Sequence, residues 1–149
     1  MKIFAAAAAV AICAAICAAN PATAASNADI ARQWGLLGIW AADCTMPPSN
    51  TNYYATFVVE GMDLVYRREW GGYAGDTNKV LRANLLGDVI EIEVRFASLD
   101  PPQTRVWGSV KEGNRMHTKY NLEVNGAFSI KDFAIVSGGA PSQWLTKCR

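Results

Sequence analysis

Most of this chain consists of short segments in which apolar and polar residues alternate, with turn residues between the segments. In the segment 89–96, Ile90 and Ile92 fall on one face of a strand, while Glu91 and Glu93 fall on the other. Alternation with a period of two is typical of antiparallel strands that cover one core and expose their other face to water. The pattern therefore predicts an all-β fold with a single core.

Turn residues divide the alternating part of the chain into strands. Asn125-Gly126 is the strongest two-residue hairpin signal, and Gly87-Asp88 marks another turn. The expected strands cover residues 37–42, 53–59, 64–70, 79–86, 89–96, 105–111, 116–124, 127–136 and 143–147. In the segment 127–136 the alternation slips around Lys131 and Asp132, which favours a β-bulge. Eight or nine strands with short connections predict an up-and-down antiparallel meander that closes into a small barrel, because closure removes exposed strand edges.

A short, two-turn helix is expected over residues 26–34, before the first strand. Ser26 and Asp29 match a capping box, and Gly35 can end the helix. Ile30 and Trp34 are one helical turn apart and can share a face. No repeat, low-complexity tract or linker interrupts the strand region after this helix, so we expect a single barrel domain over residues 25–149.

Residues 1–24 have the pattern of a secretory signal peptide. Lys2 supplies a positive charge, residues 3–19 form an alanine-rich apolar run, and Ala22-Thr23-Ala24 matches the small-x-small cleavage pattern. A membrane anchor is the alternative, but the run is near the lower length limit for a span and ends in a cleavage site. We therefore expect a periplasmic or secreted mature chain that does not insert into a membrane.

Cleavage after Ala24 would leave two cysteines, Cys44 and Cys148, near the two ends of the strand region. Only one intramolecular bridge is then possible, and an exported compartment favours its formation. A metal or redox site is the alternative, although these cysteines lack a CxxC spacing. We expect a Cys44–Cys148 disulfide closing a loop of about 100 residues, for which the chain-entropy model gives about 4–5 kcal/mol.

The charge balance of the chain bears on which partners it can bind. Without Lys2, the 14 basic residues of the chain become 13, which equals the 13 acidic residues, and no basic stripe is present. A balanced chain of this kind argues against a nucleic-acid partner. We expect a monomer whose partner is a small molecule or an envelope protein.

The sequence contains no convincing catalytic constellation. His117 is the only histidine, and it falls on the polar face of its segment, where we expect it to be solvated. No glycine-x-serine-x-glycine elbow is present. Glu91 and Glu93 share a face with Arg95, as expected for a solvated strand face. One histidine without clustered cysteines or spaced carboxylates does not predict a metal site. We therefore expect no enzyme activity, no cofactor and no metal.

The glycine-rich loop 71–78 and the strand end before it form the best candidate for a binding segment. The loop does not match a phosphate-binding pattern, because no lysine-serine/threonine pair or helix start comes after it. The segment does combine aromatic and charged residues, as loops at barrel mouths and inhibitor surfaces often do. The candidate ligand- or partner-binding residues are Arg67, Arg68, Trp70, Tyr73 and Asp76.

The motif Gly38-Ile39-Trp40, placed after a short helix, resembles the entry to lipocalin-like (calycin-type) barrels. The resemblance implies that Gly38 and Trp40 are structural, with Trp40 packed across the closed end of the barrel. It also implies a basic residue over the Trp40 ring, for which Lys147 and Arg149 are the candidates. The threonine-aspartate-tyrosine loop of lipocalins is absent. The layout "GIWAADC … WLTKC" is also similar to uncharacterised exported proteins of proteobacteria, which implies no activity.

Two functions fit these observations. The first is a non-enzymatic barrel that binds a small apolar or amphipathic molecule. The alternative is a periplasmic interaction protein, such as a protease or lysozyme inhibitor, that acts through exposed loops. A hollow interior would favour the first function. The expected inward-facing side chains are bulky and favour a filled barrel; they are Ile90, Phe96, Met116, Tyr120 and Leu122.

Overall fold

The computed structural model describes residues 24–72, 75–123 and 125–149. The predicted signal peptide lies outside these residues, apart from Ala24. The described part contains one helix and ten strands. They are α1 (Asn27–Trp34), β1 (Gly38–Ala41), β2 (Tyr54–Glu60), β3 (Asp63–Glu69), β4 (Asp76–Leu86), β5 (Val89–Phe96), β6 (Gln103–Glu112), β7 (Arg115–Glu123), β8 (Phe128–Lys131), β9 (Ala134–Ile135) and β10 (Trp144–Lys147).

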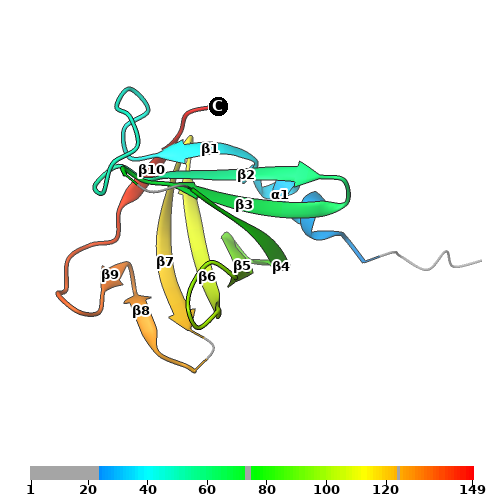
Figure 1. The fold of residues 1–149 in the computed structure, drawn as a ribbon. Helices are drawn as coiled ribbons and strands as arrows, with labels where there is room; N and C mark the ends of the chain where they lie inside the picture. The colour runs from blue at the N-terminus through cyan, green and yellow to red at the C-terminus, as the bar shows by residue number, and fades with distance from the viewer. Residues whose placement is uncertain (1–23, 73–74, 124) are drawn as a thin grey trace, which may run out of the picture.

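Eight of these strands form a closed antiparallel barrel (Figure 1). Strands β1 to β7 pair in sequence order, and β10 closes the circle because it pairs with both β1 and β7. The register places Trp40 opposite Lys147 on one side of β10 and His117 opposite Trp144 on the other. The predicted all-β meander, its closure into a barrel and the short N-terminal helix are confirmed.

The predicted strand 127–136 is wrong, because this segment forms the separate hairpin β8–β9. Asp132 and Phe133 both adopt left-handed backbone conformations (φ 49° and 67°), and these two residues reverse the chain. Ile130 then pairs with Ile135. A two-residue turn and a β-bulge both shift the phase of an alternating pattern, so the sequence did not separate them. The hairpin pairs with the C-terminal part of β7 and lies beside the barrel (Figure 1).

Helix α1 covers one end of the barrel. The expected capping box is present, since the Ser26 hydroxyl accepts from the Asp29 amide and the Asp29 carboxylate accepts from the Ser26 amide. The Trp34 indole donates to the carbonyl of Asp88 in the β4–β5 turn at 3.1 Å, which holds the helix over this end. Across the described ranges, no helix is long and apolar enough to span a membrane.

Trp40 belongs to the hydrophobic core and is completely buried. Its indole nitrogen donates to the Leu36 carbonyl at 2.7 Å, and the Lys147 ammonium lies 5.5 Å from its ring centroid. Lys147 is thus the basic residue expected over the ring. Gly38 has φ 127°, and a Cβ atom there would lie 2.0 Å from the Arg149 carbonyl oxygen. Glycine is therefore required at position 38 by both backbone conformation and space.

Cys44 and Cys148 are joined by a disulfide, with the two Cα atoms 5.4 Å apart. The bond ties the connection after β1 to the residue next after β10. The Cys148 amide also donates to the Ile39 carbonyl at 2.7 Å. The predicted pairing is confirmed, and it reinforces the contact at which the barrel closes.

A β-bulge in β7 changes which of its side chains face the interior. Gly108 pairs with Tyr120 and Ser109 pairs with Thr118, so Lys119 has no opposite residue on β6 and is the extra residue of the bulge. Beyond this residue the inward and outward positions exchange, because side-chain direction alternates with a period of two. Tyr120 consequently points outward, where its hydroxyl donates to Glu91 at 2.6 Å.

The expectation that Tyr120 and Leu122 face the interior is therefore wrong. Leu122 pairs with Val106, next to the inward-facing Trp107, and so lies on the outer face. Asn121 takes the inward position that these residues were expected to fill. Asn121 and Glu123, which pair with the inward-facing Trp107 and Arg105, thus take inward positions in place of two bulky side chains.

Candidate functional site: a cavity in the barrel mouth

A cavity of about 400 Å³ lies inside the barrel, at the end away from α1. This volume is within the usual range for small-molecule sites, about 300–1,000 Å³. An eight-stranded barrel is also just wide enough to hold one small ligand. The residues lining the cavity come from the β1–β2 connection, from strand β3 and the residue next after it, and from strands β5 to β8; they are Asn50, Tyr53, Tyr66, Arg68, Trp70, Phe96, Arg105, Trp107, Thr118, Asn121 and Ile130.

Aromatic rings form the inner wall of the cavity. Tyr66 lies at their centre: its ring centroid is 4.7 Å from that of Phe57, 5.2 Å from that of Trp107 and 6.2 Å from that of Phe96. These rings come from β2, β3, β5 and β6, and they meet in the interior of the barrel although β4 lies between β3 and β5 in the sheet. Such a wall offers flat apolar area at low conformational cost, which suits a planar or apolar ligand.

Arg68 lies against the aromatic rings of this wall and forms an ion pair with Asp76. Its guanidinium carbon lies 4.1 Å from the Phe96 ring centroid and 4.7 Å from that of Trp70, both suitable for cation–π contacts. Two guanidinium nitrogens donate to the two carboxylate oxygens of Asp76, and the Ser98 hydroxyl donates to the same carboxylate. Arg68 is therefore neutralised and fixed in position.

The ionisation states of the acidic groups at the cavity follow from their burial and from the Arg68–Asp76 ion pair. Burial raises the pKa of Asp76, but hydrogen bonds to its carboxylate, chiefly from Arg68, together with the positive charge of Arg68 outweigh that effect, so the pKa lies below its usual value. Burial raises the pKa of Tyr53 to about 12 and moves the pKa of Tyr66 further in the same direction. At neutral pH the carboxylate is thus charged, while both phenols are neutral.

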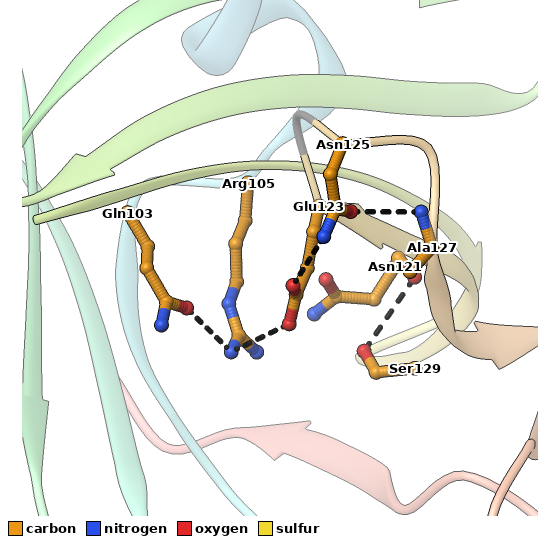
Figure 2. A network of polar contacts seen from close by, with 7 residues as sticks. All are labelled: Gln103, Arg105, Asn121, Glu123, Asn125, Ala127 and Ser129. Atoms are coloured by element: carbon orange, nitrogen blue, oxygen red, sulfur yellow. Dashed lines mark hydrogen bonds and ion pairs between the residues drawn. The ribbon is translucent and has the colours of Figure 1, made fainter. Parts of the chain in front are cut away.

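Arg105 supplies a second guanidinium, which is only partly satisfied (Figure 2). Its Nη2 atom donates to Gln103 Oε1 at 2.9 Å and to Glu123 Oε1 at 3.2 Å. Its Nε atom is buried and has no hydrogen-bond partner among the described residues. Figure 2 shows Gln103 and Glu123 on either side of the guanidinium, both reached through the same nitrogen.

Asn121 lies next to this group, and its side-chain oxygen Oδ1 is also buried without a partner in the described chain. The Ser129 hydroxyl donates to the Asn121 backbone carbonyl at 3.5 Å and leaves the side-chain amide untouched (Figure 2). Asn121 pairs with Trp107 across β6 and β7, so its amide stands beside the aromatic wall.

Neither Arg105 nor Asn121 was among the residues predicted from the sequence. A signal for Arg105 was present, because it is two residues from Trp107 and therefore shares the inward face of β6. A charged residue at an inward position is unusual and can mark a ligand contact. Asn121 had no comparable signal, since only the bulge at Lys119 turns it inward.

The predicted binding segment divides between the two faces of the barrel. Arg68 and Trp70 line the cavity, and Asp76 holds Arg68. Arg67 lies on the outer face, where it forms an ion pair with Glu60. Tyr73, the remaining candidate, lies outside the described residues.

His117 is buried rather than solvated, which corrects the sequence-based expectation. Its ring is stacked between Phe133 (4.8 Å) and Trp144 (4.4 Å), and its Nε2 atom lies 2.7 Å from the Ser142 carbonyl oxygen. The segment after β8 folds over the outer face of β7 and covers the histidine, a contact that local alternation cannot reveal. Within the described residues, no group of three or more His, Cys, Asp or Glu side chains could hold a metal ion.

No family model, curated protein or solved structure matches this chain. The cavity is consequently the feature from which a function can be inferred. It combines an aromatic wall with two paired arginines and the side chain of Asn121 in one concave space. This combination can bind and orient a small molecule that has both an apolar part and a polar part.

Proposed function

We propose that this protein is an exported, non-enzymatic, lipocalin-like barrel that binds one small amphipathic molecule in its mouth. The observation that carries the proposal is the cavity of about 400 Å³ between the aromatic wall and Arg105. Apolar lining with a few placed polar groups is the usual composition of a small-molecule site. The apolar part of the ligand would lie against Tyr66, Phe96 and Trp107, and its polar part would face Arg105 and Asn121.

The direction of the candidate side chains favours this function over an inhibitor that acts through exposed loops. A loop-based interface needs aromatic and guanidinium groups that point to the partner. Arg68 and Trp70, which could serve in that way, instead line the cavity and contact each other. Their arrangement supports binding inside the barrel.

A fluorescence titration with N-phenyl-1-naphthylamine, a neutral aromatic probe that brightens in apolar surroundings, tests the proposal. We expect saturable binding to the native protein and at least about a tenfold loss of affinity in Thr118→Phe, because the added ring occupies the cavity. Thr77→Phe is the matched control, since Thr77 is exposed on β4. Equal affinity in the Thr118 variant and the native protein, or no binding to the native protein, would contradict the proposal.

Export is tested separately by intact-mass measurement of the protein from cell envelopes. We expect a mature chain that begins near Ala25, as the cleavage pattern predicts. Alkylation without reduction should add no mass, because Cys44 and Cys148 are bonded to each other. A chain that retains residues 1–24, or two reactive thiols in unreduced protein, would count against an exported, disulfide-bonded protein.

A further inference from the structure

The segment that contains the hairpin β8–β9 is packed less tightly than any strand of the barrel. None of residues 125–141 is buried, whereas each of the eight barrel strands has at least one buried residue. Residues 125–141 also contribute nothing to the hydrophobic core or to the partly buried side chains around it. Local opening costs least where few buried apolar contacts are lost. This segment, which we call the flap, can therefore open without unfolding the barrel.

The flap forms part of the side wall of the cavity. Near α1, β7 pairs with β10 through residues 115–117, but toward the open end it pairs with β8 through residues 121–122. Ile130 of the flap lines the cavity, as does Tyr53 of the β1–β2 connection. In the described chain the sheet order ends at β9, so the flap pairs with the barrel along β7 only (Figure 1). Peeling the flap away from β7 would open the cavity through the side of the barrel.

Phe133 attaches the tip of the flap to the barrel. Its ring centroid lies 4.8 Å from that of His117, and its amide donates to the Lys119 carbonyl at 2.9 Å. Its own carbonyl accepts from the Ser142 amide at 2.7 Å. His117 and Ser142 are both buried, so these contacts join the exposed flap to a well-packed part of the molecule.

The backbone of Phe133 is strained, and the hairpin turn does not require a phenylalanine at this position. Phe133 has φ 67° and is the second residue of the two-residue turn between Lys131 and Ala134, where glycine is usual. A bulky residue with positive φ is costly and persists only where the surrounding structure imposes the conformation. The contacts with His117 and Lys119 are what impose it here. The role of Phe133 is therefore to hold the flap against β7 rather than to reverse the chain.

From these observations we propose that the flap is a gate, which opens when Phe133 leaves His117 and admits the ligand through the side of the barrel. This inference rests on the proposed function and adds how the ligand reaches the same site. Phe133 is not among the residues that line the cavity. Its contacts are therefore alike in the free and the bound protein, so breaking them changes the entry and exit rates by the same factor and leaves the affinity unchanged.

Phe133→Gly tests the gate, because it gives the turn its usual residue and removes the aromatic contact with His117. Stopped-flow fluorescence with N-phenyl-1-naphthylamine measures both rate constants on the full mature chain. We expect association and dissociation each to be about tenfold faster than in the native protein, with the same Kd, as for the loss of one aromatic pair. Asp132→Gly is the matched control, since it also places a glycine in the turn but keeps Phe133; we expect native rates.

The other outcomes of this experiment separate the two proposals. Native rates in Phe133→Gly would overturn the gate and leave the proposed function intact. Faster dissociation with unchanged association would also overturn it, because the flap would then be part of the binding surface. If the native protein does not bind the probe, both proposals fail.

Amide hydrogen exchange of the ligand-free mature chain, followed by mass spectrometry, tests the opening itself. We expect peptides from residues 125–141 to exchange faster than those of the barrel strands, and about tenfold faster still in Phe133→Gly. Barrel peptides should exchange at the native rate in this variant, which distinguishes flap opening from a general loss of stability. Exchange of the flap and the barrel at one common rate would mean that the flap opens only by global unfolding, and it would overturn the gate.

Discussion

The two ends of the barrel treat their polar groups in opposite ways. At the end closed by α1, the indole of Trp40 donates to the Leu36 carbonyl and the ammonium of Lys147 donates to the Gly35 carbonyl. At the open end, Arg105 Nε and Asn121 Oδ1 are buried without partners in the described chain. Both ends are rich in aromatic rings, so the difference lies in hydrogen bonding and in the space left between side chains.

This difference separates a structural end from a binding end. Buried polar groups normally have partners, because an unpaired group costs about 1–3 kcal/mol. The closed end obeys this rule and fills its interior around Trp40, which is completely buried. The open end gives up some of that stability and keeps a cavity of about 400 Å³, which is the space that a ligand can use.

The largest expected contrast is between two tryptophans, one at each end. Trp40→Ala should lower the free energy of unfolding by about 3–5 kcal/mol, because it removes a fully buried aromatic side chain. Trp70→Ala should cost less than about 1 kcal/mol, because Trp70 is only partly buried at the cavity rim. Urea denaturation midpoints of the two variants measure the contrast. Equal losses would remove the distinction between the ends.

Two asparagines provide the next contrast. Asn27 at the closed end donates to the carbonyls of Val80 and Leu81 and accepts from the Ala83 amide, so Asn27→Leu should cost about 2 kcal/mol. Asn121→Leu should cost nothing or stabilise the fold by up to about 1 kcal/mol, because it removes an unsatisfied oxygen. Thermal unfolding of both variants measures the difference. A larger loss for Asn121 than for Asn27 would mean that its amide has a structural partner.

The smallest expected effect concerns acid. The pKa of Asp76 is lower in the folded protein than its ordinary value of 3.8, so its pairing with Arg68 stabilises the fold above that value and is lost as the pH falls through the folded pKa. Asp76→Asn should therefore be less stable than the native protein at pH 6, and the difference should shrink below about pH 4. Denaturation at a series of pH values between about 2 and 7 measures this difference. A gap between the two proteins that stays constant down to about pH 2 would mean that Asp76 does not contribute through its charge.

Local patterns were sufficient to predict most of the barrel. Alternation of period two identified the strands because each covers a core with one face, and the turn residues between them defined the order. The capping box of α1, the burial of Trp40 and the Cys44–Cys148 pairing were also confirmed. The signal peptide remains a prediction, since it lies outside the described residues apart from Ala24.

The candidate site was only partly predictable. Arg68, Trp70 and Asp76 were selected from local composition, as part of a strand end and a glycine-rich loop, and this selection did not show that Arg68 and Trp70 line a cavity. Asp76 is the first residue of β4, where it pairs with Arg68 in register. A sequence window shows that such residues are near one another in the chain, but it does not show on which side of the sheet each side chain lies.

The sequence by itself determined the strand order, the closure of the meander and the residues of the closed end, because each depends on local periodicity, turn chemistry or a single pair of cysteines. Only the tertiary structure decided what the open end contains. The bulge at Lys119 depends on how β7 pairs with β6, and it alone turns Asn121 inward and Tyr120 outward. The burial of His117 depends on a segment that folds back over β7. Both outcomes arise from contacts between distant parts of the chain, so they cannot be predicted from the residues next to each position in the sequence.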